Sequence, residues 1–176
     1  YVNLVAGGGA GTKTLLGAVV VAGAFTTDAG VTTAMGANDL TVTGVTDIDG
    51  VVAVAGNILT LSGASEIDGT MTISTGTVDA NGTFDATNGT ITFSDAGNLT
   101  LASVVTGLGI LSSDNGTVAY DGTGDQGIVE DIYYNLRAGS GGIKTLGGDV
   151  TLTNDLTINT DVTIAMDTHD LSVTNA

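Results

Sequence analysis

The chain has 176 residues, 19 of them acidic and only three Lys or Arg, a net charge of −16, and neither proline nor cysteine. This charge excludes nucleic acid as a partner and disfavours anionic lipid, because no basic stripe exists to displace counterions from phosphates. The lack of cysteine excludes disulfides and thiolate chemistry, and no apolar run approaches the roughly 20 residues that a membrane-spanning helix needs.

The first segment of the chain, residues 1–44, returns near the end as residues 133–176. The matching positions include Asn3, Leu4, Lys13, Thr14, Met35, Asp39, Leu40 and Val42, which recur as Asn135, Leu136, Lys144, Thr145, Met166, Asp170, Leu171 and Val173. Long periods of this kind are typical of arrays and solenoids. We therefore predict one solenoid domain built of repeat block 1–44, middle segment 45–132 and repeat block 133–176.

Short apolar-Thr-apolar segments mark the predicted strands. They lie at residues 40–42, 59–61, 71–73, 91–93, 99–101, 150–152, 156–158 and 162–164. Their alternation has period two, which indicates strands with one apolar face and one Thr-rich face. Residues 14–22 could be a helix on their Ala and Leu content. We expect a strand, because the equivalent residues 145–153 carry a Gly pair and β-branched side chains.

Turn residues separate these strands. The dipeptides Asn81-Gly82, Asn88-Gly89 and Asn115-Gly116 predict tight turns with positive φ. Short strands at irregular intervals, few aromatic residues and repeated blocks favour an all-β parallel β-helix (β-solenoid), with a β-sandwich as the alternative.

Aspartates near glycine turns are the candidate metal ligands. Asp47 and Asp49 flank Ile48, and Asp121 and Asp125 enclose a Gly-Thr-Gly turn, so that their oxygens could hold Ca²⁺. Neither an EF-hand loop nor tandem nonapeptides are present. Solvated turn carboxylates therefore remain the alternative, and Ca²⁺ is the only cofactor that the sequence suggests.

The remaining motifs do not predict catalysis. Residues 7–14 (GGGAGTKT) resemble a phosphate-binding loop, but Thr12 lies between the glycines and Lys13, and no helix is predicted to follow. His169 has no second histidine or cysteine for a zinc site and is expected in a surface turn. Arg137 is the single arginine, which leaves little for an acid-based glycosidase site. We expect no enzymatic activity.

Residues 116–146 are similar to the long repeats of bacterial surface β-strand repeat proteins, the filamentous-haemagglutinin-like and autotransporter-like adhesins. The match is carried by Tyr120, Gln126, Tyr134, Asn135, Leu136, Lys144, Thr145 and Leu146, and in part again by residues 1–15. The resemblance implies export to the cell surface, a right-handed β-helix, and a role in adhesion or in building a sheath or filament.

The segment Tyr1-Val2-Asn3-Leu4 has neither an initiator Met nor a charged leader region, which indicates a trimmed N-terminus of an exported protein. We expect an acidic, secreted structural protein that self-assembles head to tail into an extracellular filament. The expected assembly ends are Tyr1, Val2, Asn3, Leu4, Leu171, Val173 and Ala176. The alternatives are a fragment of a long adhesin that binds a glycan or protein receptor and, from the outward threonines, an ice-binding solenoid. No nucleic acid and no membrane insertion are expected.

Overall fold

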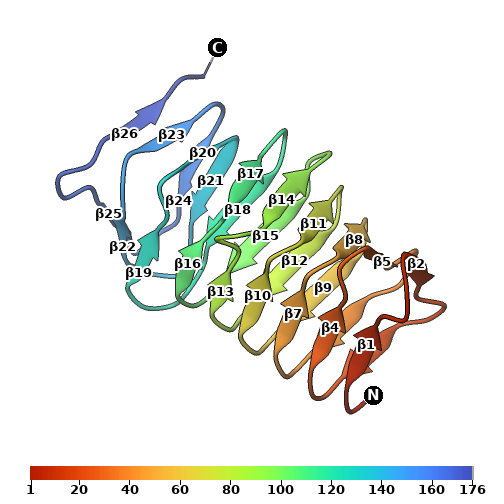
Figure 1. Cartoon of the computed structure of the whole chain (residues 1–176). Coiled ribbons are helices and arrows are strands. Elements are labelled where there is room, and N and C mark those ends of the chain that lie inside the picture. The colour runs from red at the N-terminus through yellow and green to blue at the C-terminus, as the bar shows by residue number, and fades with distance from the viewer. Residues whose placement is uncertain (176) are drawn as a thin grey trace.

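The computed structural model describes residues 1–175, and all of its regular elements are strands. The strands stack in parallel as a β-solenoid of about eight turns (Figure 1). This confirms the predicted β-helix and excludes the β-sandwich alternative. Each turn, here called a coil, contributes three strands to three faces. The coils stack along one axis from the N-terminal end, red in Figure 1, to the blue C-terminal end.

Two six-stranded sheets form two faces of the first six coils. Sheet A consists of β1 (Leu4–Ala6), β4 (Phe25–Thr27), β7 (Thr46–Ile48), β10 (Ser65–Ile67), β13 (Phe84–Asp85) and β16 (Val105–Gly107). Sheet B consists of β2 (Gly11–Thr14), β5 (Val31–Ala34), β8 (Val51–Ala55), β11 (Thr70–Ile73), β14 (Thr90–Phe93) and β17 (Ile110–Ser112).

The third face, sheet C, continues past this point. It consists of β3 (Val19–Val21), β6 (Leu40–Val42), β9 (Ile58–Leu61), β12 (Thr77–Ala80), β15 (Asn98–Leu101), β18 (Thr117–Tyr120), β21 (Asn135–Ala138) and β24 (Leu156–Ile158). The other two faces continue as separate three-stranded sheets. Sheet D holds β19 (Gln126–Ile128), β22 (Gly142–Leu146) and β25 (Val162–Ala165), and sheet E holds β20 (Asp131–Tyr133), β23 (Val150–Leu152) and β26 (Leu171–Val173).

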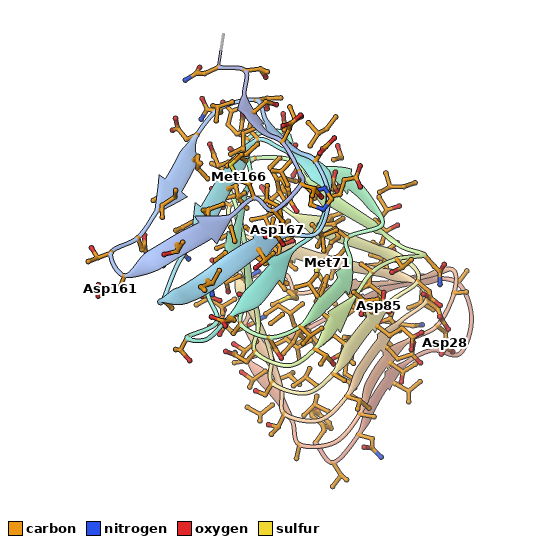
Figure 2. All side chains as sticks on the ribbon, turned by 90° about the vertical axis from the view of Figure 1, so that its left-hand side faces the viewer. Asp28, Met71, Asp85, Asp161, Met166 and Asp167 are labelled. Carbon is orange, nitrogen blue, oxygen red and sulfur yellow. The ribbon has the colours of Figure 1, made fainter. Side chains whose placement is uncertain are left out.

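Alternation within each strand builds the core. In β6, Leu40 and Val42 are buried and Thr41 points outward, and the same pattern recurs in β9 and β15. Stacking places like residues in register, as in the inner row that runs from Leu40 to Leu59. This confirms that the apolar-Thr-apolar segments are strands with inward apolar side chains. Figure 2 views the molecule from the left-hand side of Figure 1 and shows Met71 in the interior, whereas Asp28 and Asp161 lie at the periphery.

Glycines allow close stacking at the corner that connects sheet C to sheet A. A Cβ atom on Gly44, Gly63 or Gly82 would collide with the carbonyl oxygen of the corner glycine one coil earlier. Four successive corners, at Gly23, Gly44, Gly63 and Gly82, therefore place a residue without a side chain at the same point. The glycines with positive φ lie at other positions, such as Gly30 and Gly36, and Gly82, Gly89 and Gly116 are not among them. The prediction of positive φ at the three Asn-Gly dipeptides was therefore wrong. These dipeptides do not form isolated hairpin turns, because their backbone is packed against the neighbouring coil.

The predicted strand over residues 14–22 is interrupted. β2 ends at Thr14, a bend follows, and β3 begins at Val19, because the chain turns there from sheet B to sheet C. The equivalent residues 145–153 show the same break between β22 and β23. The helix alternative is excluded for both segments.

The two repeat blocks lie on different faces of the solenoid. The strands of the first block, β1 to β6, occupy sheets A, B and C in turn, whereas their counterparts β21 to β26 occupy sheets C, D and E. β21 is the twentieth strand after β1. Because three strands make one coil, the repeat period is six coils plus two strands, one strand short of seven coils. The second block therefore begins on the face of sheet C and not on that of sheet A, and each of its strands is shifted by one face relative to its counterpart in the first block.

Candidate functional site

Acidic side chains gather on the outer surface of sheet A. The outward Asp47 of β7 pairs in register with Glu66 of β10, and Glu66 pairs with Asp85 of β13. Neighbouring strands lie about 4.8 Å apart, so the three carboxylates form a ladder along the axis, here called the acidic ladder. The sequence identified Asp47 but gave no sign that Glu66 and Asp85 lie beside it, because residues of adjacent coils are about 20 positions apart.

The environment of the acidic ladder differs from one end to the other. Partial burial and the negative charges of Asp49 and Asp68 raise the pKa of Asp47 above its ordinary value of 3.8. Hydrogen bonds lower the pKa of Asp85, whose Oδ1 accepts from the Thr87 hydroxyl at 2.6 Å and the Thr87 backbone N–H at 3.0 Å. Asp85 is therefore stabilised as an anion, whereas Asp47 lies among other anions.

A shallow cleft of about 510 Å³ runs beside the acidic ladder. It is lined by Val45, Thr46, Asp47, Ala64, Ser65, Glu66, Thr83, Asp85 and Thr106. Within residues 1–175, no three His, Asp or Glu side chains converge closely enough to hold a metal ion. The Ca²⁺ site at Asp47 and Asp49 stays a prediction. In the structure, Glu66 and Asp68 of the next coil also lie near Asp47.

Asp121 and Asp125 lie in the loop between β18 and β19, where sheet A gives way to sheet D. The Asp125 Oδ1 accepts a hydrogen bond from the Ile143 backbone N–H at 2.9 Å. The Asp121 Oδ1 is buried without a hydrogen-bond partner. Burial raises the pKa of Asp121, and Arg137 partly offsets this shift. The two predicted ligands therefore have different neighbours, and Asp125 already binds the next coil.

Lys144, in β22 of the next coil, anchors this loop. Its side chain is fully buried, and its Nζ donates hydrogen bonds to the carbonyl oxygens of Gly122 at 2.6 Å and Gly124 at 2.9 Å. Burial lowers the pKa of Lys144. The sequence does not reveal that Lys144 is buried, because its burial depends on the neighbouring coil: it points inward from strand β22 under the loop of the preceding coil.

Gln126 closes the loop from the other side and is also buried. Its Nε2 donates to the carbonyl oxygens of Leu101 at 2.8 Å and Ser103 at 2.7 Å, and its Oε1 accepts from the Gly122 N–H at 3.2 Å. Its amide thus pairs with backbone groups that would otherwise be buried without partners at the break between sheets A and D.

Two tyrosines complete this polar group inside the core. The Val129 N–H donates to the Tyr120 hydroxyl at 3.1 Å, the two tyrosine hydroxyls lie 3.0 Å apart, and the Tyr133 hydroxyl donates to the Val129 oxygen at 2.6 Å. Each hydroxyl can therefore both donate and accept. Burial raises the pKa of Tyr120 to about 12. We call Tyr120, Gln126, Tyr133 and Lys144 the junction cluster.

The junction cluster lies next to a cleft of about 340 Å³ between β16 and β19. The cleft is lined by Ala102, Ser103, Val104, Val105, Gly122, Gly124, Asp125, Gln126 and Gly127. Its polar wall is the Gln126 amide, whose donors and acceptor are already bonded to backbone. Three members of the cluster (Tyr120, Gln126 and Lys144) belong to the motif that carries the adhesin resemblance, and the structure gives these motif positions a role in joining coils.

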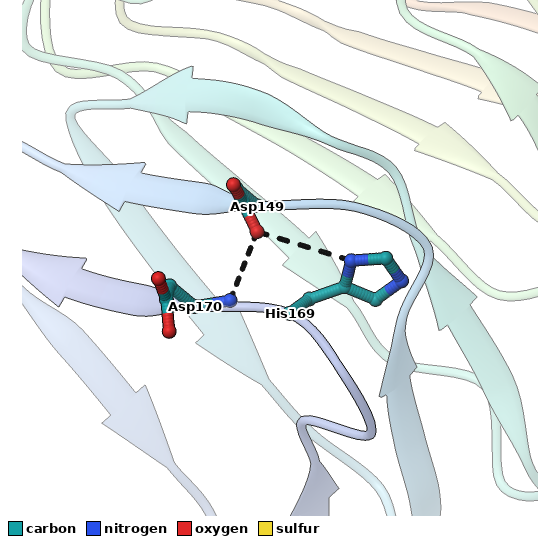
Figure 3. A network of polar contacts seen from close by, with 3 residues as sticks. All are labelled: Asp149, His169 and Asp170. Carbon is teal, nitrogen blue, oxygen red and sulfur yellow. Dashed lines mark hydrogen bonds and ion pairs between the residues drawn. The ribbon is translucent and has the colours of Figure 1, made fainter.

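His169 lies in the turn that precedes β26, as Figure 3 shows. Its Nδ1 is 3.8 Å from the Asp149 Oδ1, and the same oxygen accepts a hydrogen bond from the Asp170 N–H at 3.0 Å. The imidazole is one-third exposed. The contact joins the last two coils at the surface, in agreement with the turn position predicted from the sequence.

The predicted assembly ends lie in the outermost coils. The Tyr1 amino group donates to the Val20 oxygen at 2.6 Å, and the Asn3 Oδ1 accepts from the Ala24 N–H at 2.8 Å. Val2 stays exposed, and Leu4 begins the edge strand of sheet A. Leu171 and Val173 lie in β26, the edge strand of sheet E. Ala176 lies outside the described residues.

No helix among residues 1–175 is long and apolar enough to cross a membrane. Comparisons with models of protein families, with curated proteins and with solved structures each found no match. The resemblance to surface β-strand repeat proteins therefore rests on the motif residues quoted above.

Proposed function

We propose that this chain is an extracellular structural rod that is lengthened by adding further β-coils to its ends. The observation that carries the proposal is the regular stacking itself: sheet C runs through eight strands from β3 to β24 with parallel pairing throughout. A solenoid of this kind is extended by one coil at a time, since each coil contacts only its neighbours.

The outermost coils supply surfaces for such growth. β1, β2 and β3 at one end and β24, β25 and β26 at the other are edge strands. Ile158 belongs to the inner row of sheet C, yet it is 48 % exposed because no coil covers it. Edge strands with apolar neighbours pair readily with further strands. The next coil can come from a second copy, giving a filament or sheath, or from the same polypeptide in a longer adhesin.

The charge distribution is compatible with a rod in an extracellular setting. A net charge of −16 keeps neighbouring rods apart laterally, whereas contacts at the ends involve mainly backbone groups and core rows. An adhesive role would require a receptor site along the sides or at the far end of such a rod. The acidic ladder and the junction cleft are the surfaces that a glycan array would probe.

Negative-stain imaging and sedimentation of the purified chain over a range of concentrations test the proposal. Head-to-tail growth predicts filaments whose length increases with concentration. Ile158→Asp should abolish them by placing a charge on the inner row. Ile143→Asp is the matched control, because Ile143 is similarly exposed, at 44 %, but lies outward on sheet D.

Single particles of constant mass at every concentration would contradict self-assembly and would favour the longer adhesin, in which the same polypeptide supplies the neighbouring coils. Filaments that survive Ile158→Asp but not Ile143→Asp would show that growth proceeds through the sides. That result would contradict extension of the rod by its ends.

A further inference from the structure

Along the first six coils, the outward positions of sheet B carry no charged side chain, although the chain as a whole is strongly acidic. Lys13, the one charged residue of this sheet, occupies the inner row, in register with the buried Thr33. On sheet B each strand presents two outward positions, which align in two rows along the axis. The first row is Thr12, Thr32, Val51, Thr70, Thr90 and Ile110, and the second row is Thr14, Ala34, Ala53, Thr72, Thr92 and Ser112. We call these two rows the threonine face.

The other two faces of the same coils differ from it. Sheet A carries the acidic ladder, and the outward row of sheet C includes Asp79. The absence of charge on sheet B is therefore a property of one face and not of the strands in general. These outward positions offer no charge to pair with an ionic ligand, so the face favours a neutral one.

The threonine face is also a two-dimensional lattice. Its rows repeat about every 4.8 Å from coil to coil, and the two rows lie about 6.7 Å apart along each strand. The outward pairs stay in register across the face, because the one register shift in this sheet falls after Thr72. Hydroxyl and methyl groups are thus presented at fixed intervals in two directions.

The side chains of this lattice are held in place before any ligand arrives. Threonine is β-branched and restricted at χ1, and the Thr72 hydroxyl donates to the Val52 carbonyl of the preceding coil at 3.4 Å. The four threonines Thr70, Thr72, Thr90 and Thr92 form a two-by-two block on β11 and β14. Little conformational entropy is lost on binding, which favours a rigid, periodic partner.

We propose that the threonine face binds ice. The surface of hexagonal ice is neutral and flat, and its oxygens recur in two directions at distances of the same size as the lattice on sheet B. The hydroxyls can hold water at lattice positions, while the methyl groups and the small Ala34 and Ala53 side chains leave room for ordered water between them. This binding is independent of whether the rods join end to end.

The test compares matched lysine pairs on two faces of the full chain. Thr72→Lys with Thr92→Lys places two charges on adjacent coils of sheet B, and Thr41→Lys with Thr60→Lys does the same on adjacent coils of sheet C. The probe is ice itself, through partition into slowly grown ice and the depression of the freezing point below the melting point. Circular dichroism and melting temperature report the fold.

The wild type should be enriched in ice over the liquid. The sheet B pair should lower this enrichment by about tenfold or more, and the sheet C pair should leave it unchanged. If the lysine pair on sheet B impairs folding, Thr72→Ser with Thr92→Ser replaces it and should weaken binding by removing the two methyl groups.

Three results would overturn the proposal. The first is a wild type that ice excludes as it excludes an ordinary acidic protein. The second is an equal loss of ice affinity from both lysine pairs. The third is a dimer in sedimentation that the sheet B pair alone dissociates, since the threonine face would then be an interface between two copies.

Discussion

The two repeat blocks place the same residue types in different surroundings. Lys144 of the second block is fully buried beneath the loop of the preceding coil and binds two carbonyl groups there. Its counterpart Lys13 lies in the first coil, has no loop above it and is exposed. Tyr133 and Tyr1 differ in the same way, with exposed fractions of 0 % and 73 %. The environment of a repeat residue therefore depends on the neighbouring coil as well as on the sequence.

Local turn geometry, in contrast, is the same in both blocks. The Asn38 N–H bonds the Met35 oxygen at 3.1 Å, and the equivalent His169 N–H bonds the Met166 oxygen at 2.8 Å. Asn3 and Asn135 each accept a backbone N–H from the next coil through Oδ1. Short-range geometry thus follows the sequence, whereas burial follows stacking.

The largest expected difference between the blocks is at the lysines. Lys144→Met removes the donor for the Gly122 and Gly124 carbonyls, and leaving these buried groups unpaired should lower the free energy of unfolding by about 2–4 kcal/mol. Lys13→Met should change it by less than about 0.5 kcal/mol. Urea unfolding of both variants measures the difference, and equal effects would contradict a structural role for the buried lysine.

The tyrosines provide a smaller contrast of the same kind. Tyr133→Phe removes a hydroxyl that bonds both Tyr120 and Val129, so we expect a loss of about 1–2 kcal/mol. Tyr1→Phe should have no measurable effect on the free energy of unfolding. A Tyr133→Phe variant as stable as the wild type would show that the hydrogen-bond chain contributes nothing net.

The residues at two left-handed turn positions also differ between the blocks, and here it is the first block that has the more favourable residues. Gly30 and Gly36 have φ of 78° and 65°, while their equivalents Asp161 and Asp167 have 64° and 50°. Glycine adopts this region without steric cost. Asp167→Gly should therefore raise stability by about 0.5 kcal/mol, and Gly36→Asp should lower it by a similar amount. Thermal melting checks both, and a destabilised Asp167→Gly would indicate that the carboxylate has a role in the turn.

The acidic ladder belongs to the middle segment and has no counterpart in either repeat block. Because the pKa of Asp47 is raised in the folded state, folding binds protons between that pKa and the ordinary value of 3.8. This contribution to stability grows as pH falls through that interval. At pH 7, Asp47→Asn should raise stability by a few tenths of a kcal/mol by removing like-charge repulsion.

The gain from Asp47→Asn should shrink as the pH approaches 4, where the wild-type carboxyl is itself increasingly protonated. Asp161→Asn, outside the acidic ladder, serves as the control. A gain from Asp47→Asn that stays constant between pH 7 and pH 4 would exclude Asp47 as its source.

The sequence was sufficient for the architecture because period-two alternation and the repeated block both depend on near neighbours. It predicted the strands at Leu40–Val42 and Leu156–Ile158. It did not predict the acidic ladder or the burial of Lys144, since both depend on which residues stack one coil apart. Coil length varies, so the partner of Asp47 or Lys144 cannot be counted along the chain. The rotation of the second block by one face is hidden for the same reason.

The parallel, in-register stack is tested most directly by one distance. Thr41 and Thr157 lie outward in the same row of sheet C, and six steps from strand to strand separate them. The chain has no native cysteine, so Thr41→Cys with Thr157→Cys carries two spin labels at defined sites. Dipolar spectroscopy should give a narrow distribution near about 30 Å, six times the strand spacing. A broad distribution, or a maximum far from this distance, would contradict the stacked solenoid.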